Sequence, residues 1–226
     1  MRSYQLVREL LDLVEKFEQE DAGVAPTLTD FAGFLVNHLE GQNDTATTLD
    51  VRFGEEELQT QQMAYQLDNS IARLFIYMSR YAKFYIKKAL DGTALRSAED
   101  FTALAILFTH ESLSRSELIS RNLQEKPSGT EVITRLLQAR LIQQWDDEND
   151  KRTKRVAITN GGKELLYHVF QDMNQVSKMV TGSLSAAEKF TLRYLLQKLE
   201  NFHYHHHELK TIKSKNDLTK HAGKLV

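Results

Sequence analysis

The segment Asp150-Lys151-Arg152-Thr153-Lys154-Arg155 places four basic side chains within five positions. A β-hairpin is predicted around it, because residues 141–145 and 155–159 have strand-like composition and 146–150 is rich in turn-forming residues. A basic hairpin tip suits the minor groove of A·T-rich DNA, where negative potential is concentrated. Asp150 stands two residues before Arg152, so its carboxylate can hold the guanidinium and fix its direction. An ordinary solvated basic loop is the alternative interpretation.

Capping signals predict three short helices before this hairpin. In each, a serine hydroxyl can accept a hydrogen bond from a first-turn amide while an acidic side chain three residues later reaches back. The second and third helices are separated by little more than residues 123–127, a spacing typical of a helix-turn-helix. Two helices followed by a basic hairpin predict a winged helix-turn-helix. The three pairs are Ser97 with Asp100, Ser114 with Glu117, and Ser128 with Glu131.

Longer amphipathic helices are predicted on both sides of this region. Residues 4–17 and 28–39 keep a helical apolar period, and a long helix runs from about 57 to 90, where Asp91-Gly92 ends it. Two further helices follow the hairpin, and Ser185 with Glu188 caps the second. The expected fold class is therefore mainly α with a small β-hairpin wing.

The chain here resembles the MarR family (multiple antibiotic resistance regulators) of bacterial winged-helix transcription factors, over about residues 61–210. Family members usually have glycine where this chain has Arg140, and arginine in a left-handed helix end costs about 1 kcal/mol. Pro127 stiffens the turn, and residues 1–60 have no counterpart in the family core. The matching text is Ser116-Glu117-Leu118-Ile119, Val132-Ile133-Thr134-Arg135-Leu136-Leu137, Leu141-Ile142, the wing residues Asp150, Arg152 and Arg155, Ile158-Thr159-x-x-Gly162, and Leu184-Ser185-x-x-Glu188.

The resemblance implies that the third helix enters the major groove of double-stranded DNA and that the wing borders the minor groove. Arg152, supported by Asp150, would enter the minor groove, while Lys151, Lys154 and Arg155 would meet phosphates. Lys126 would contact a further phosphate. The candidates for base contacts are Ser128, Thr130, Glu131, Thr134 and Arg135.

The resemblance also implies a homodimer on a pseudo-palindromic operator, modulated by a small-molecule effector. Repression is the favoured output, with activation as the alternative. An aromatic-rich stripe on the long helix would line part of the effector pocket, with core or dimer interface as the alternative. The pocket candidates are Phe75, Met78, Tyr81 and Tyr85. The expected divisions are an acidic helical extension (1–40), a linker (41–60), a first dimerisation helix (61–96), the winged helix-turn-helix DNA-binding domain (97–160), C-terminal dimerisation helices (161–210) and a basic tail (211–226).

The charge of the chain is divided unevenly along its length. With 29 basic and 31 acidic residues the formal net charge is −2, which by itself argues against a nucleic-acid partner. Residues 1–60, however, hold four basic and 13 acidic side chains, a net charge of −9, so the remainder carries +7. A basic body fits a polyanionic partner, and the acidic extension would weaken nonspecific DNA binding. The absence of cysteine excludes disulfides, thiolate metal sites and thiol-based sensing.

Other signals favour ordinary structure over chemistry. His203 and His207 are four residues apart, as a helical metal pair would be, but no third ligand has a fitting spacing. Solvated histidines at a helix C-terminus are the favoured alternative, so no metal or other cofactor is expected. The lysine-bearing tail is expected to be frayed.

Enzymatic function is not expected, because the sequence has no nucleophile motif, no phosphate-binding glycine loop and no paired carboxylates with a partner base. A winged helix that binds protein, or an architectural module without ligand control, remains the alternative. Since no stretch approaches the ~18 apolar residues of a membrane span, no membrane partner is expected. We therefore expect a cytoplasmic protein.

Overall fold

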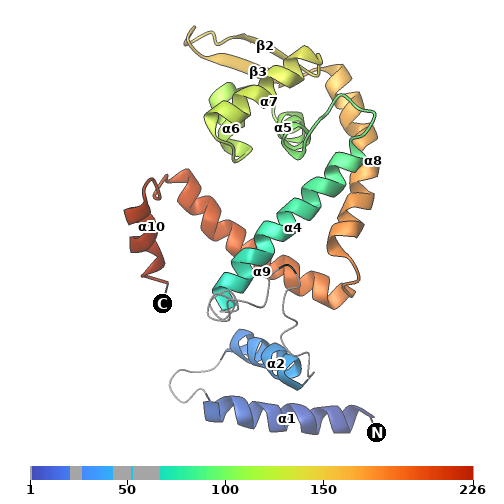
Figure 1. Ribbon diagram of the computed structural model, residues 1–226, viewed down its shortest axis with the longest axis vertical. Helices are drawn as coiled ribbons and strands as arrows, with labels where there is room; N and C mark the ends of the chain where they lie inside the picture. The colour runs from blue at the N-terminus through green and yellow to red at the C-terminus, as the bar shows by residue number, and fades with distance from the viewer. Residues whose placement is uncertain (1, 21–26, 43–51, 53–66, 226) are drawn as a thin grey trace. The chain divides into compact units, whose positions relative to one another are not determined.

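The computed structural model describes residues 2–20, 27–42, 52 and 67–225 (Figure 1). The chain divides into two compact units, residues 1–69 and 70–226. Within the described ranges, no helix is both long enough and apolar enough to cross a membrane.

The first unit contains a pair of helices, α1 (Arg2–Glu20) and α2 (Leu28–Gln42). Phe17 of α1 is buried, with its ring 5.5 Å from that of Phe31 and 5.4 Å from that of Phe34. The Asp30 amide donates to the Thr27 hydroxyl at 3.2 Å, which satisfies an amide at the start of α2. Both helices confirm the sequence prediction. The predicted linker begins inside α2, and its residues 43–51 and 53–60 lie outside the described residues.

The long helix α4 (Leu67–Ala89) opens the rest of the chain. It was predicted from about residue 57, and residues 53–66 lie outside the described ranges. It ends as predicted at Asp91-Gly92, where Gly92 has a φ of +77° that a glycine tolerates without steric cost. No residue of α4 is buried, although much of its surface is apolar.

The winged helix-turn-helix follows as α5 (Ala98–Phe108), β1 (Leu113–Ser114), α6 (Arg115–Arg121), α7 (Lys126–Gln138), β2 (Ile142–Asp146) and β3 (Lys154–Ile158). The sheet has the antiparallel order β1-β3-β2, with Gln144 opposite Val156. This confirms the mainly α fold with a small wing. Figure 1 shows these elements gathered in one lobe from which α4 and α8 extend.

The core of this lobe is built from one apolar face of each helix and the inner face of the sheet. Leu104 and Leu107 of α5, Leu118 of α6 and Leu136 of α7 are each at most 1% exposed. Val156 of β3 is fully buried among them. The two-residue strand β1 was not predicted from sequence, since two residues show no periodicity.

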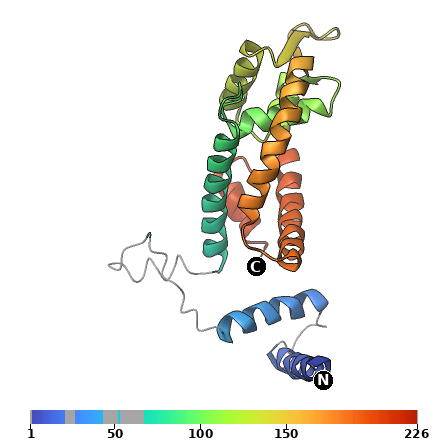
Figure 2. The ribbon, with the colours of Figure 1, turned by 90° about the vertical axis from the view of Figure 1, so that its right-hand side faces the viewer.

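Helices α8 (Asn160–Thr181) and α9 (Ala186–Glu208) follow the wing, and Figure 2 shows α8 running away from the lobe and α9 turning back toward it. α8 buries Leu166, Val169 and Met173 against the lobe, whereas α9 buries no residue. The Ser185–Glu188 capping box is present, as predicted. The expectation of a frayed tail is wrong, because a further helix, α10 (Lys215–Ala222), begins with the Ser214 hydroxyl accepting from the Asp217 amide.

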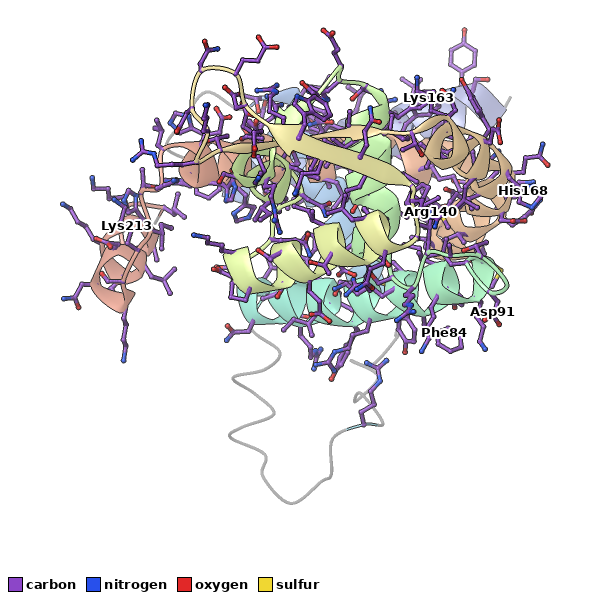
Figure 3. The ribbon with its side chains drawn as sticks, turned by 90° about the horizontal axis from the view of Figure 1, so that it is seen from above. Phe84, Asp91, Arg140, Lys163, His168 and Lys213 are labelled. Atoms are coloured by element: carbon purple, nitrogen blue, oxygen red, sulfur yellow. The ribbon has the colours of Figure 1, made fainter. Side chains whose placement is uncertain are left out.

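The connection from α7 to β2 has the left-handed conformation that Arg140 was expected to strain. Arg140 has a φ of +58° and lies where α7 gives way to β2, as labelled in Figure 3. Gly162 allows the start of α8 to approach this turn, because a Cβ atom there would lie 2.2 Å from the Leu141 carbonyl oxygen. The turn is therefore left-handed despite the arginine.

Candidate nucleic-acid interface

The support helix α6 is fixed at its start by a reciprocal cap. The Glu117 amide donates to the Ser114 hydroxyl at 3.1 Å, and the Ser114 amide donates to Glu117 Oε2 at 2.7 Å. The hydrogen bond from the Ser114 amide, helped by the Ser114 side chain, lowers the pKa of Glu117 below its ordinary value. This predicted capping box is therefore present, and it sets the direction of the first helix of the helix-turn-helix.

The recognition helix α7 packs unusually close to α6 at Gly129. This glycine is buried, and a Cβ atom in its place would lie 2.5 Å from Ile119 Cγ1 of α6. The close crossing of the two helices therefore depends on the missing side chain. This close contact was not predicted from sequence, although a glycine inside a predicted helix was an available signal.

The start of α7 differs from its prediction. The helix begins at Lys126 with Pro127 in its first turn, and its N-cap is Glu125, whose side chain makes no capping bond. The predicted cap of Ser128 with Glu131 is therefore wrong, since both residues lie inside the helix. Proline is well suited to the first turn, where its missing N–H costs no hydrogen bond.

Most of the predicted base-reading side chains lie on the outer surface of α7. Lys126, Ser128, Glu131 and Thr134 are exposed, and Thr130 is half-buried. The Thr134 hydroxyl donates to the Thr130 carbonyl oxygen at 2.8 Å.

Arg135 differs from these residues, because the structure turns its guanidinium toward α5. Arg135 Nη2 donates to Asp100 Oδ1 at 2.6 Å, and Nη1 lies 3.3 Å from Glu131 Oε1. The hydrogen bond to Asp100 raises the pKa of Arg135. Its cation is held inside the protein, so this geometry does not support its predicted contact with bases. Asp100, the carboxylate that holds it, was identified from sequence only as a capping residue.

The wing tip holds Arg152 as the sequence suggested. Asp150 Oδ1 accepts from the Arg152 amide at 3.1 Å and from Arg152 Nε at 3.2 Å, while Asp150 Oδ2 accepts from the Thr153 hydroxyl. The bond from the Arg152 amide, followed by that from its side chain, lowers the pKa of Asp150. The Arg152 side chain is nevertheless 92% exposed, so it projects from the wing in an oriented state.

The two other inner wing cations are engaged with the protein itself. Lys154 forms an ion pair with Asp146 across the hairpin. Arg155 donates from Nε to the Ser112 hydroxyl at 2.9 Å, donates from Nη2 to the Ser112 carbonyl oxygen at 3.0 Å, and meets Asp147 at 3.3 Å. Arg155 therefore fastens the wing to the segment before β1. Of the four basic residues, Lys151 and Arg152 are exposed at the tip, and Arg152 is held there by Asp150.

The residues predicted to line an effector pocket lie along α4. Phe75, Met78 and Tyr81 are 43–45% exposed, and Tyr85 packs against the core. An open hollow of about 510 Å³ lies elsewhere, on α5 and the end of α6, and none of the four lines it. Its lining residues are Thr102, Ala105, Ile106, Thr109, Arg121, Asn122 and Leu123.

The histidine cluster at the end of α9 makes contacts of an ordinary kind. His207 Nε2 lies 3.2 Å from the Ser120 carbonyl oxygen of α6, and the His203 ring packs edge-on against Phe202. Among the described residues, no group of three or more potential ligands is arranged to hold a metal ion.

Comparison with known proteins identifies relatives with the same architecture. No family model matches the sequence. The HTH-type transcriptional repressor NicR of Pseudomonas putida is 31% identical over 120 residues, which are 53% of this chain and 75% of NicR. A mutant MarR of E. coli complexed with operator DNA has a TM-score of 0.52 and 26% identity, covering 59% of this chain and 98% of that one. BpsR of Bordetella bronchiseptica, whose DNA binding is regulated by 6-hydroxynicotinic acid, has a TM-score of 0.54 at 21% identity, covering 58% and 98%.

Proposed function

The chain belongs to the MarR family of winged helix-turn-helix transcription regulators, and on this basis we propose that it is a homodimeric repressor that binds a pseudo-palindromic operator. The observation that carries the proposal is the wing, where Asp150 orients an Arg152 that is 92% exposed. A guanidinium held in this way matches the narrow minor groove of an A·T-rich tract. The family consists of regulators of transcription, in agreement with the prediction that the chain is not an enzyme.

Sequence recognition is assigned to the exposed surface of α7, which would lie in the major groove. Their exposure on α7, partial for Thr130, supports Ser128, Thr130, Glu131 and Thr134 as contacts to base edges, and that of Lys126 supports a phosphate contact at the start of the helix. Arg135 is left out of this set, because Asp100 and Glu131 hold its cation. Lys151 is the wing residue assigned to a phosphate.

A homodimer is supported by the apolar surfaces that α4 and α9 leave exposed. Neither helix buries a residue, and exposed apolar patches of this extent mark an interaction surface. A two-fold dimer places the recognition helices about one DNA turn, or about 34 Å, apart. The exposed apolar residues include Ile71, Leu74, Phe75, Ile76, Met78, Tyr81 and Phe84 of α4, with Phe190, Leu192, Tyr194, Leu195, Leu196, Leu199 and Phe202 of α9. Sedimentation analysis should give twice the 26.0 kDa chain mass.

Control by a small organic effector is the final part of the proposal. It is supported by the relative BpsR, which responds to 6-hydroxynicotinic acid, and by the aromatic residues of α4 near the lobe. Phe75, Met78, Tyr81 and Tyr85 remain the candidates for effector contact. Once an effector that releases DNA is found, Phe75→Ala or Tyr81→Ala should weaken the response, and an unchanged response would remove α4 from the pocket.

The deciding experiment is a gel-shift titration of the protein with the DNA upstream of its own gene. The wild-type chain should bind, and Arg152→Ala should lose binding while its circular dichroism spectrum and thermal unfolding stay unchanged. Lys178→Ala, an exposed lysine of α8 away from the wing, is the matched control and should bind normally. Failure of the wild-type chain to bind duplex DNA would favour a protein-binding or architectural winged helix.

A further inference from the structure

The first turn of α5 is joined to three other helices, through two of its side chains and one carbonyl oxygen. Glu99 Oε1 lies 2.7 Å from Lys83 Nζ of α4, and the next residue, Asp100, accepts from Arg135 Nη2 of α7 at 2.6 Å. Asn122, the C-cap of α6, donates from Nδ2 to the Glu99 carbonyl oxygen at 3.0 Å. We call these five residues the α5 junction. None of them is among the DNA-contacting residues of the proposed function, because Arg135, a candidate from sequence, is held by Asp100.

The half of the junction that faces α7 is rigid. The Asp100 side chain is 1% exposed, and its Oδ1 atom accepts from both Nη2 and Nε of Arg135. Asp100 Oδ2 also accepts from the Arg96 amide at 2.9 Å. Because the planar guanidinium is engaged through two N–H groups, it has little freedom to rotate against the carboxylate. A displacement of the α5 start must therefore move α7 with it.

The half that faces α4 is more accessible. The Glu99 side chain is 31% exposed and that of Lys83 is 61% exposed. Burial of Glu99 opposes its ionisation, but hydrogen bonds with Lys83 and the local backbone outweigh this and lower its pKa. The carboxylate is thus charged at neutral pH. Both acids also lie at the positive end of the α5 helix dipole, which stabilises them in place.

Consecutive residues on a helix point about 100° apart, so one rigid turn can hold neighbours on two sides. We propose that Glu99 and Asp100 are positioning residues that couple helix α4 to the recognition helix α7, so that the placement of α4 sets the spacing of the two recognition helices in the dimer. This inference rests on the proposed function, because it assumes a dimer joined through α4 and read by α7.

The test compares binding to two duplexes by the full-length protein. The first is the operator that the protein selects from a randomised pool, and the second has one base pair inserted between the half-sites. With a rigid junction, the wild-type protein should bind the first duplex much more tightly than the second. Glu99→Gln, Lys83→Gln and Asp100→Asn should each reduce the ratio of the two affinities by about tenfold, mainly by improving relative binding to the lengthened site. Lys87→Gln, an exposed lysine one turn along α4, is the matched control and should keep the wild-type ratio.

Two features of this design separate coupling from simple destabilisation. A purely structural role would lower both affinities together and leave their ratio unchanged, which would overturn the inference. Lys83 is paired with Glu99 and Arg135 with Asp100, so the effects of Lys83→Gln and Arg135→Lys on the ratio should multiply if the two pairs act independently. Coupling through the junction predicts that the double variant resembles either single one, and multiplicative effects would refute it.

If Asp100→Asn fails to fold, the exposed pair still decides the question, because Glu99→Gln and Lys83→Gln change groups at the surface. If the wild-type protein selects no operator, the proposed function fails and this inference fails with it. If the wild-type protein binds and discriminates but both surface variants behave as it does, only the inference fails.

Discussion

Replacing Gly129 by alanine tests how closely the two helices of the helix-turn-helix must approach. The added Cβ atom would lie 2.5 Å from Ile119 Cγ1, 2.9 Å from Ile119 Cγ2 and 3.1 Å from Ile119 Cβ. Rotation about χ1 of Ile119 cannot relieve all three contacts, because the last involves the rotation axis itself. The helices must therefore separate by several tenths of an ångström or the backbone must bend.

The expected loss of stability follows from two opposing effects. Overpacking a well-filled core costs about 1–3 kcal/mol, while alanine in a helix gains roughly 0.5–1 kcal/mol over glycine. The net destabilisation should therefore be about 1–2 kcal/mol. Gly161→Ala is the matched control, because it lies in the first turn of α8 with its nearest neighbour, Thr159 Oγ1, 3.9 Å from the new Cβ atom. This control should be neutral or slightly stabilised.

Urea denaturation of the wild type and both variants at one protein concentration measures these differences. A double variant that adds Ile119→Ala to Gly129→Ala removes two of the three clashing atoms. Its loss of unfolding free energy should therefore be smaller than the sum of the two single losses by about 1 kcal/mol. If Gly129→Ala proves as stable as Gly161→Ala, the close packing of α6 on α7 does not depend on the glycine and the reasoning is wrong.

Three further outcomes follow from other features of the chain. Glu117→Gln should destabilise the protein at neutral pH but hardly at about pH 3. The folded state lowers the pKa of Glu117, so the stability it contributes is present above the unfolded-state pKa and is lost as the pH falls through the folded-state pKa. Urea titrations at both pH values check this. Arg155→Ala should speed amide hydrogen exchange in β3, since the wing loses its attachment to Ser112; unchanged exchange would argue against that role. Removing residues 1–56 should tighten binding to random duplex at low salt, because the deleted segment is strongly acidic; equal affinity would exclude this electrostatic effect.

The sequence predicted best those features that depend on neighbouring residues. The caps at Ser114 and Ser185 and the pairing of Asp150 with Arg152 each join residues at most three positions apart, so local spacing was sufficient. Ser128 shows the limit of such signals. It had the same spacing to an acid, but Pro127 favours the first turn of a helix and the helix begins at Lys126.

Contacts between distant residues could not be predicted in the same way. Arg135 and Asp100 are 35 residues apart, and Arg155 and Ser112 are 43 apart, so no periodicity connects them. In both cases an arginine that looked available for DNA is held by the protein. The expectation of a frayed tail failed for a different reason, because the Ser214 cap that begins α10 is a local signal that was overlooked.

These internal ion pairs reduce the number of wing cations that are available to contact DNA. Residues 146–155 hold four acidic and four basic side chains, so the wing is neutral overall and Lys154 and Arg155 are paired with Asp146 and Asp147. The salt dependence of DNA binding reflects only those cations that displace counterions from DNA. Each phosphate contact contributes about 0.9 to the slope of log binding constant against log salt concentration. Lys151→Gln should therefore lower the slope of a dimer by about 2, whereas Lys154→Gln should leave it nearly unchanged. Equal changes in the two slopes would mean that the Asp146 pair opens on binding and that the wing acts through its total positive charge.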